Sequence, residues 1–339
     1  MRRWTRSSQD GGERVTPKFA FGALAVLGVV ALALPAPAAP VSFATFFQPI
    51  AVAYSPAALL VTRYCEDPHK VYAIDSKGNV SEFATLPSVT GAPVCREIYL
   101  TVSPGGLPKW PANEIFANDS TGTIFKIDQN RNVSTFSQLP VCGLEHNALT
   151  FDTEGLFGHV LLATCATGHI YKVDRDGSST LLTLVSETPP FAIEGPYVAP
   201  LSFPQYGGDL FVTNEFSGHI VAVAPAGTFT VVQTWPGAEG VNFIPTNVCE
   251  FGGSGGAYFR ADFTNGAILT SPARDFAGLG GAGLIRSEPV GFTPGAGEAV
   301  LDCPSTGACT VTPFGQDVGI QIEGATFVDF SPGCRFNKK

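Results

Sequence analysis

Five glutamates stand at regular intervals along this chain of 339 residues. Glu97, Glu145, Glu194 and Glu239 follow one another at spacings of 48, 49 and 45 residues, and Glu323 in IEGATFV repeats the surroundings of Glu194 in IEGPYV. Carboxylates that meet at one place repel one another unless a cation lies among them or some keep their protons. The spacing therefore suggests a site for Ca²⁺, another divalent cation or a cationic group. Alternatively, each Glu accepts backbone hydrogen bonds within a structural repeat.

A histidine accompanies this series at one position. His146 directly follows Glu145 and has no counterpart after the other four glutamates. An imidazole beside a carboxylate can serve as a general base or a metal ligand. Glu145, His146 and Glu194 are therefore the candidates for catalysis, while simple packing of His146 is the alternative.

Internal repeats explain why the glutamates recur. Similar segments begin at His69, Gly122, Gly168 and Gly218, and each holds a short apolar strand, a polar turn and a second strand. Two further apolar strands precede each segment, so the unit has four strands and about 45–53 residues. A four-stranded unit repeated at this period is typical of a β-propeller blade. The glutamates then stand at the start of the innermost strands, which line the central channel.

The repeat predicts an all-β fold with six blades of four antiparallel strands, although five or seven blades remain possible. Composition agrees, because the chain has 38 Gly, 27 Pro and only 14% charged residues, as expected for short strands joined by tight turns. The fifth blade is expected to begin near Glu239 and to continue through 257–263 and 267–273. Residues 283–330 would form the sixth blade and close the ring.

The first 38 residues have the pattern of a signal peptide. Five basic residues precede the apolar run 19–34, and Ala36-Pro37-Ala38 fits the cleavage rule. We expect cleavage after Ala38, no membrane span in the mature protein, and a single propeller domain over 39–339, either extracellular or periplasmic. Removal takes away five of 20 basic and two of 29 acidic residues and leaves a net charge near −12, which argues against nucleic acid as a partner.

All eight cysteines lie after the predicted cleavage site, and an even number in an exported chain suggests disulfides. Cys303 and Cys309 are close enough to staple one hairpin. Cys142 and Cys165 flank strands of one repeat and can pair. The pairs Cys65–Cys95 and Cys249–Cys334 would follow by elimination among the many possible connectivities.

The stretch 194–227 resembles six-bladed propellers of the NHL, TolB-like and gluconolactonase/strictosidine-synthase type. It holds Glu194-Gly195-Pro196, the Gly207-Gly208 turn, an apolar strand and the hairpin 218–223. The likeness extends at blade level over most of 39–339. It implies the propeller fold and, for the lactonases, a metal held by channel residues.

Two classes of function are compatible with these patterns. A secreted module that binds or scaffolds a ligand or ion at the channel mouth is favoured, because no complete catalytic constellation is recognisable. The alternative is a metal-dependent, lactonase-like hydrolase in which channel carboxylates hold a cation that polarises a carbonyl or activates water. Whether the protein is an enzyme is left open, its partner is an unknown small molecule or protein, and we expect a monomer.

Overall fold

The computed structural model describes residues 39–108, 110–144, 146–186, 193–289, 297–315 and 320–328. The predicted signal peptide, Glu145 and Cys334 lie outside these ranges. The described residues form 24 strands and one short 3-10 helix, η1 (Ala273–Phe276). Among them, no helix has the length and apolar character needed to cross a membrane.

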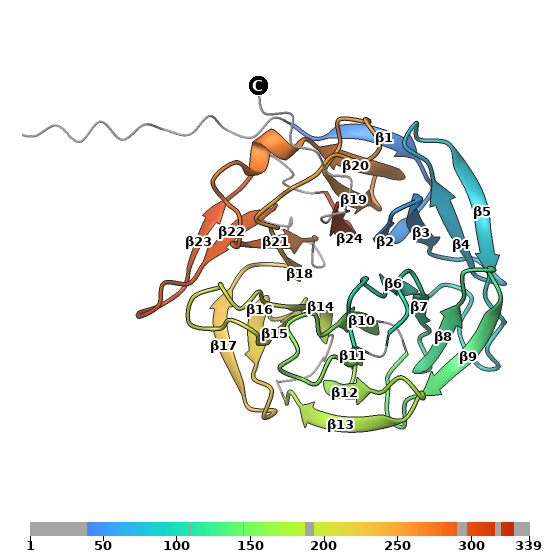
Figure 1. The fold of residues 1–339 in the computed structure, drawn as a ribbon, viewed down its shortest axis with the longest axis horizontal. Helices are drawn as coiled ribbons and strands as arrows, with labels where there is room; N and C mark the ends of the chain where they lie inside the picture. Colours follow the sequence, from blue (N-terminus) through green and yellow to red (C-terminus); the bar gives the residue numbers. More distant parts are fainter. Residues whose placement is uncertain are drawn as a thin grey trace, which may run out of the picture. The chain divides into compact units, whose positions relative to one another are not determined.

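The strands make six sheets of four antiparallel strands each, arranged around a central axis (Figure 1). This confirms the predicted six-bladed propeller. Blades 1 to 4 each use four consecutive strands, from innermost to outermost: β2 (Pro49–Ser55), β3 (Ala58–Arg63), β4 (Lys70–Ile74) and β5 (Val80–Thr85); β6 (Tyr99–Val102), β7 (Ile115–Asn118), β8 (Thr123–Ile127) and β9 (Val133–Gln138); β10 (Ala148–Phe151), β11 (Leu161–Thr164), β12 (His169–Val173) and β13 (Ser179–Leu184); β14 (Ile193–Val198), β15 (Leu210–Asn214), β16 (His219–Val223) and β17 (Phe229–Thr234).

Blades 5 and 6 exchange strands, and here the sequence-based assignment was wrong. The strands predicted over 257–263 and 267–273 belong to blade 6, and most of 283–330 belongs to blade 5. Blade 5 consists of β18 (Ala238–Phe243), β21 (Gly283–Ser287), β22 (Ala299–Asp302) and β23 (Thr310–Pro313); blade 6 consists of β24 (Ile322–Phe327), β19 (Tyr258–Asp262), β20 (Ala267–Ser271) and β1 (Val41–Thr45). The physical reason is that alternating apolar patterns identify strands but do not select their partners.

The ring is closed by strands from both ends of the described chain. β1 pairs with β20 at the rim, and β24 pairs with β19 near the axis (Figure 1). β24 also contacts the inner strands β2 and β18 of its two neighbouring blades. Because one sheet contains the first and the last described strands, the ring cannot open without breaking strand pairs.

Aromatic side chains fill the space between neighbouring blades. Phe203, Phe211 and Phe243 meet edge to face between blades 4 and 5, with ring centroids 4.9–5.6 Å apart. Trp110, Phe116 and Phe151 do the same between blades 2 and 3. The 26 phenylalanines of the chain therefore have a use, because wedge-shaped spaces between twisted sheets need large rigid side chains.

Three disulfides join pairs that the sequence predicted: Cys65–Cys95, Cys142–Cys165 and Cys303–Cys309. The first two link a blade to its neighbouring connection, and the third staples the β22–β23 hairpin. The expected Cys249–Cys334 pair falls partly outside the described residues.

Glycine follows each of three axial glutamates because the next blade leaves no room for a side chain. A Cβ on Gly324 would lie 2.5 Å from the carbonyl oxygen of Ile50 and 2.8 Å from Cα of Ala51. Gly195, whose φ is +52°, faces the backbone of Glu239 and Gly240 in the same way. The repeated Glu-Gly pair thus brings a carboxylate to the axis while letting inner strands approach closely.

We expect Gly324→Ala to lower the free energy of unfolding by about 1–3 kcal/mol, the usual cost of overpacking. The measurement is urea unfolding. Gly105→Ala is the matched control, because its added Cβ would make only an ordinary 3.6 Å contact with Ala112. Equal stability of the two variants would show that blades 6 and 1 do not pack as closely as described.

Candidate functional site

Four of the five predicted glutamates converge on the axis. Glu194, Glu239 and Glu323 lie at the starts of inner strands β14, β18 and β24, and each is at most 2% exposed. Glu97 lies two residues before β6, and its side chain is 13% exposed. The fifth, Glu145, lies outside the described residues. Because each inner strand begins near the axis, equivalent positions in different blades bring their carboxylates together.

His146 joins this group from blade 3. Its Nδ1 lies 2.6 Å from Oε1 of Glu194 and 3.3 Å from Oε2 of Glu97. Its backbone has φ of +53°, a conformation that a non-glycine residue rarely adopts. Strain of this kind persists where surrounding structure holds a residue for a purpose. The imidazole is therefore part of the carboxylate group rather than of the apolar packing.

Two further carboxylates were missed by the sequence analysis. Glu215 directly follows β15 and Glu288 directly follows β21, so both stand just beyond the second strand of their blades. Glu215 Oε2 lies 3.8 Å from Nδ1 of His146. This shared position was a usable signal, but it was hidden because 283–288 had been assigned to the wrong blade.

The ligand atoms of these residues form three overlapping groups, within each of which all atoms lie within 4.8 Å of one another. The groups are Glu97, His146 and Glu194; Glu194, Glu215 and Glu239; and Glu239, Glu288 and Glu323. We call these seven residues the axial cluster. In the part of the chain that the structure describes, no Lys or Arg forms an ion pair with its six carboxylates.

The hydroxyl of Tyr99 lies at the centre of one side of the axial cluster. Its oxygen is 3.0 Å from Glu239 Oε1, 3.2 Å from Glu194 Oε2 and 3.4 Å from Glu323 Oε2. A phenol has one proton to donate, so it can satisfy only one of these oxygens at a time. Burial and the surrounding carboxylates raise the pKa of Tyr99 well above its usual value, so the group stays neutral.

Burial makes several of these glutamates hold protons near neutral pH. Burial, followed by the neighbouring carboxylates, raises the pKa of Glu239 and of Glu323 well above the usual value. Burial and a hydrogen bond to Glu215 raise the pKa of Glu288 to about 11. Like charges in a low-dielectric site cannot all ionise, so protons take the place of missing cations.

One ion pair remains ionised within the axial cluster. Burial favours the neutral forms of both Glu194 and His146, but their mutual attraction outweighs it. The nearby imidazolium therefore holds the pKa of Glu194 below its usual value, and the carboxylates of Glu194 and Glu97 raise the pKa of His146. The cation-free cluster thus contains an imidazolium and a carboxylate among largely protonated acids.

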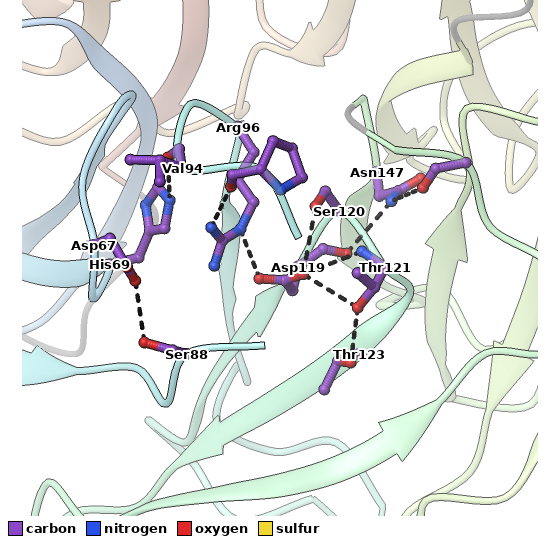
Figure 2. A network of polar contacts seen from close by, with 12 residues as sticks. Asp67, His69, Ser88, Val94, Arg96, Asp119, Ser120, Thr121, Thr123 and Asn147 are labelled. Atoms are coloured by element: carbon purple, nitrogen blue, oxygen red, sulfur yellow. Dashed lines mark hydrogen bonds and ion pairs between the residues drawn. The ribbon is translucent and has the colours of Figure 1, made fainter. Parts of the chain in front are cut away.

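A buried polar network positions the Glu97 and His146 side of the axial cluster (Figure 2). Arg96, adjacent to Glu97 in the chain, donates from Nε to Oδ2 of Asp119 at 2.9 Å. Asn147, adjacent to His146, donates from Nδ2 to the backbone carbonyl of Asp119 at 3.3 Å. Asp119 also accepts from the backbone N–H of Thr121, which holds its own turn. One carboxylate therefore links the approaches to β6 and β10.

We expect the cation-free protein to lose stability as pH rises from 5 to 8. Raised pKa values mean that folded Glu239, Glu288 and Glu323 keep protons that the unfolded chain loses above about pH 4.5. The folded state then binds more protons, so the free energy of unfolding falls by up to about 1.4 kcal/mol per pH unit for each proton held. The raised pKa of His146 acts in the same direction, because its stabilisation is lost as pH rises.

Urea unfolding at pH 5, 6.5 and 8 in the presence of a chelator measures this slope. Glu288→Gln removes one titrating group and should make the slope shallower. Stability that is constant or rises over this range would contradict the protonation pattern.

The fold and the axial cluster define the class: a six-bladed β-propeller with a buried carboxylate and imidazole cluster on its axis. A scan against protein-family models finds no match, and a search of curated proteins finds none. The particular propeller family suggested by the sequence therefore stays a prediction.

Solved structures with related folds have low sequence identity to this chain. A catalytically inactive virginiamycin B lyase from Staphylococcus aureus with quinupristin is 12% identical, with a TM-score of 0.46 over 81% of this chain and 73% of that one. PQQ-bound aldose sugar dehydrogenase from Streptomyces coelicolor is 13% identical, with a TM-score of 0.42 over 85% and 98%. An auxiliary nutrient binding protein from Bacteroides thetaiotaomicron is 11% identical, with a TM-score of 0.45, and the match spans 65% of this chain but only 58% of its length. The propeller assignment rests on the strand order, and the functions of these proteins are not transferred to this one.

Proposed function

We propose that this protein is a secreted binding module whose axial cluster takes up a divalent cation, with Ca²⁺ as the favoured ion. The observation that supports this most is the set of three overlapping groups of ligand atoms, each within 4.8 Å. Six buried carboxylates without a Lys or Arg ion pair among the described residues offer more negative charge than one imidazolium can balance. A divalent cation would replace the protons that the cluster otherwise needs.

The ligand set favours a hard cation. Ca²⁺ takes six to eight oxygen ligands at about 2.3–2.6 Å, and carboxylates supply them singly or in pairs. His146 is the one nitrogen donor, and an imidazole with carboxylates also suits Mn²⁺ or other transition metals. Ca²⁺ is favoured because Glu194, Glu239 and Glu323 provide oxygen atoms from three blades without needing the imidazole.

The binding role is favoured over the hydrolase alternative by the state of His146. A general base must be neutral to accept a proton. Contact with Glu194 and Glu97 raises the pKa of His146, so the imidazole is charged before any cation binds. The lactonase-like reading requires that a bound cation releases this proton and also keeps an open coordination position.

The proposed location follows from the cysteines and the N-terminal segment. Three disulfides among the described residues are typical of an oxidising compartment. The predicted signal peptide over 1–38 agrees with export. Extracellular calcium modules work with dissociation constants of about 10⁻⁴–10⁻³ M, which sets the range in which binding should be sought.

Calorimetric titration of chelator-treated protein with Ca²⁺ tests the proposal. We expect saturable binding near one ion per chain, with release of protons because ligands that hold protons must lose them. Titrations in two buffers of different ionisation enthalpy count those protons, and affinity should increase from pH 6 to pH 8.

The control variant is Glu82→Gln, which alters an exposed carboxylate paired with Lys70 and should leave binding unchanged. The absence of Ca²⁺ and Mn²⁺ binding at millimolar concentration would overturn the proposal. Cation-dependent hydrolysis of a simple lactone that is lost in His146→Gln would instead support the hydrolase alternative.

A further inference from the structure

A cavity of about 180 Å³ lies on the propeller axis beyond the axial cluster. Its lining comes from inner strands of all six blades, and the lining residues follow the glutamates along those strands, as Thr101 follows Glu97 and Thr326 follows Glu323. None of the six clustered carboxylates lines it. Tyr99 contributes to both places, so the cavity adjoins the axial cluster but is separate from it.

Arg286 on β21 lines this cavity with a buried guanidinium. The residue is 4% exposed, and its cross-strand neighbour Gly240 leaves room for the side chain to lie against β18. Its Nε donates to Oδ1 of Asn242 at 2.9 Å, and Asn242 is held in turn by a bond from Nδ2 to the carbonyl of Ala325. The orientation of the guanidinium is therefore set by the protein.

The positive charge of Arg286 has no carboxylate partner. Nη1 is buried and has no hydrogen-bond partner, and no Asp or Glu of the described chain lies within ion-pair distance. The two other strongly buried arginines differ in this respect, because Arg96 pairs with Asp119 and Arg260 pairs with Glu298. A buried charge without a partner is costly, so its retention beside a cavity points to an anion that comes from outside.

We propose that Arg286 and this cavity form a binding site for a small organic carboxylate. A guanidinium suits a planar carboxylate, because its N–H groups match the two oxygens. A cavity of about 150 Å³ in another protein accepts benzene, so 180 Å³ fits a ligand of this size. Leu149 and Phe151 give the cavity apolar walls for the body of the ligand, while Thr150 and Thr326 offer hydroxyls.

Benzoate and benzamide test the site, because they have nearly the same shape and differ in charge. Titration calorimetry of chelator-treated wild-type protein should show benzoate binding at least ten times more tightly than benzamide. Inorganic phosphate, as a tetrahedral anion without an apolar body, should bind more weakly than benzoate. The chelator keeps this result independent of the proposed cation, so either proposal can fail while the other stands.

Arg286→Met should reduce benzoate affinity at least tenfold, and Arg175→Met, at an exposed turn, should leave it unchanged. Without ligand, Arg286→Met should unfold at the same or a higher temperature than wild type, because an unpaired buried charge is removed. Equal binding of benzoate and benzamide, or unchanged benzoate binding in Arg286→Met, would overturn the proposal. Tighter phosphate than benzoate binding would overturn the choice of a carboxylate. If Arg286→Met does not fold, the comparison of the ligands on wild type still decides.

Discussion

Calcium at 100 times its dissociation constant should raise the free energy of unfolding by about 2.7 kcal/mol, and Glu194→Gln should remove most of that increase. Ca²⁺ binds the folded chain but not the separated glutamates of the unfolded chain, so binding energy adds to stability. Glu194 contributes to two of the three groups of ligand atoms, so one change affects both. Glutamine preserves the size of the side chain while removing its charge.

The measurement is the difference between urea unfolding curves with Ca²⁺ and with chelator, taken for each variant separately. Taking the difference matters because Glu194→Gln also leaves the His146 imidazolium without its closest carboxylate and changes the stability of the cation-free protein. Glu82→Gln should keep the full increase. An increase in Glu194→Gln as large as in wild type would place the cation elsewhere.

Asp119→Ala should destabilise the protein by about 3–5 kcal/mol, which is the usual result of removing one partner of a buried ion pair. Arg96 and Asp119 are 3% and 1% exposed, so the remaining guanidinium could not reach water. The same variant should weaken Ca²⁺ binding, because Asp119 holds both Arg96 next to Glu97 and Asn147 next to His146 (Figure 2).

Urea unfolding and calcium titration of the same preparation measure both effects. Lys70→Ala is the control, since it breaks an exposed ion pair of similar length and should have no measurable effect. The double variant Arg96→Met with Asp119→Leu should recover part of the loss, because no unpaired charge remains. A loss below about 1 kcal/mol in Asp119→Ala would show that this pair does not hold the site.

Local sequence patterns predicted the repeated parts of the molecule. Strand alternation and turn residues act over a few positions, so the four strands of blades 1 to 4 could be recognised in order. The Glu-Gly pairs at Glu194, Glu239 and Glu323 likewise indicated which strands lie on the axis. The pairing of Cys303 with Cys309 was predictable because six residues separate them.

Strand partners across long separations could not be predicted in the same way. β19 and β20 follow β18 in the chain, yet they pair with β24 and β1, which come from the opposite ends of the described chain. Any exposed strand edge offers the same backbone groups, so the choice depends on how whole blades pack. His146 was a candidate by sequence, but its contact with Glu194 depends on two different blades.

The sequence by itself determined a propeller of four-stranded units with glutamates at the starts of inner strands, because periodicity and turn chemistry are local. Only the tertiary structure decided that β21 pairs with β18. That pairing brings Glu288 into the axial cluster and Arg286 to the cavity, and neither was predicted. The physical reason is that burial, protonation and charge pairing depend on neighbours in space, which β21 acquires through a strand 40 residues away.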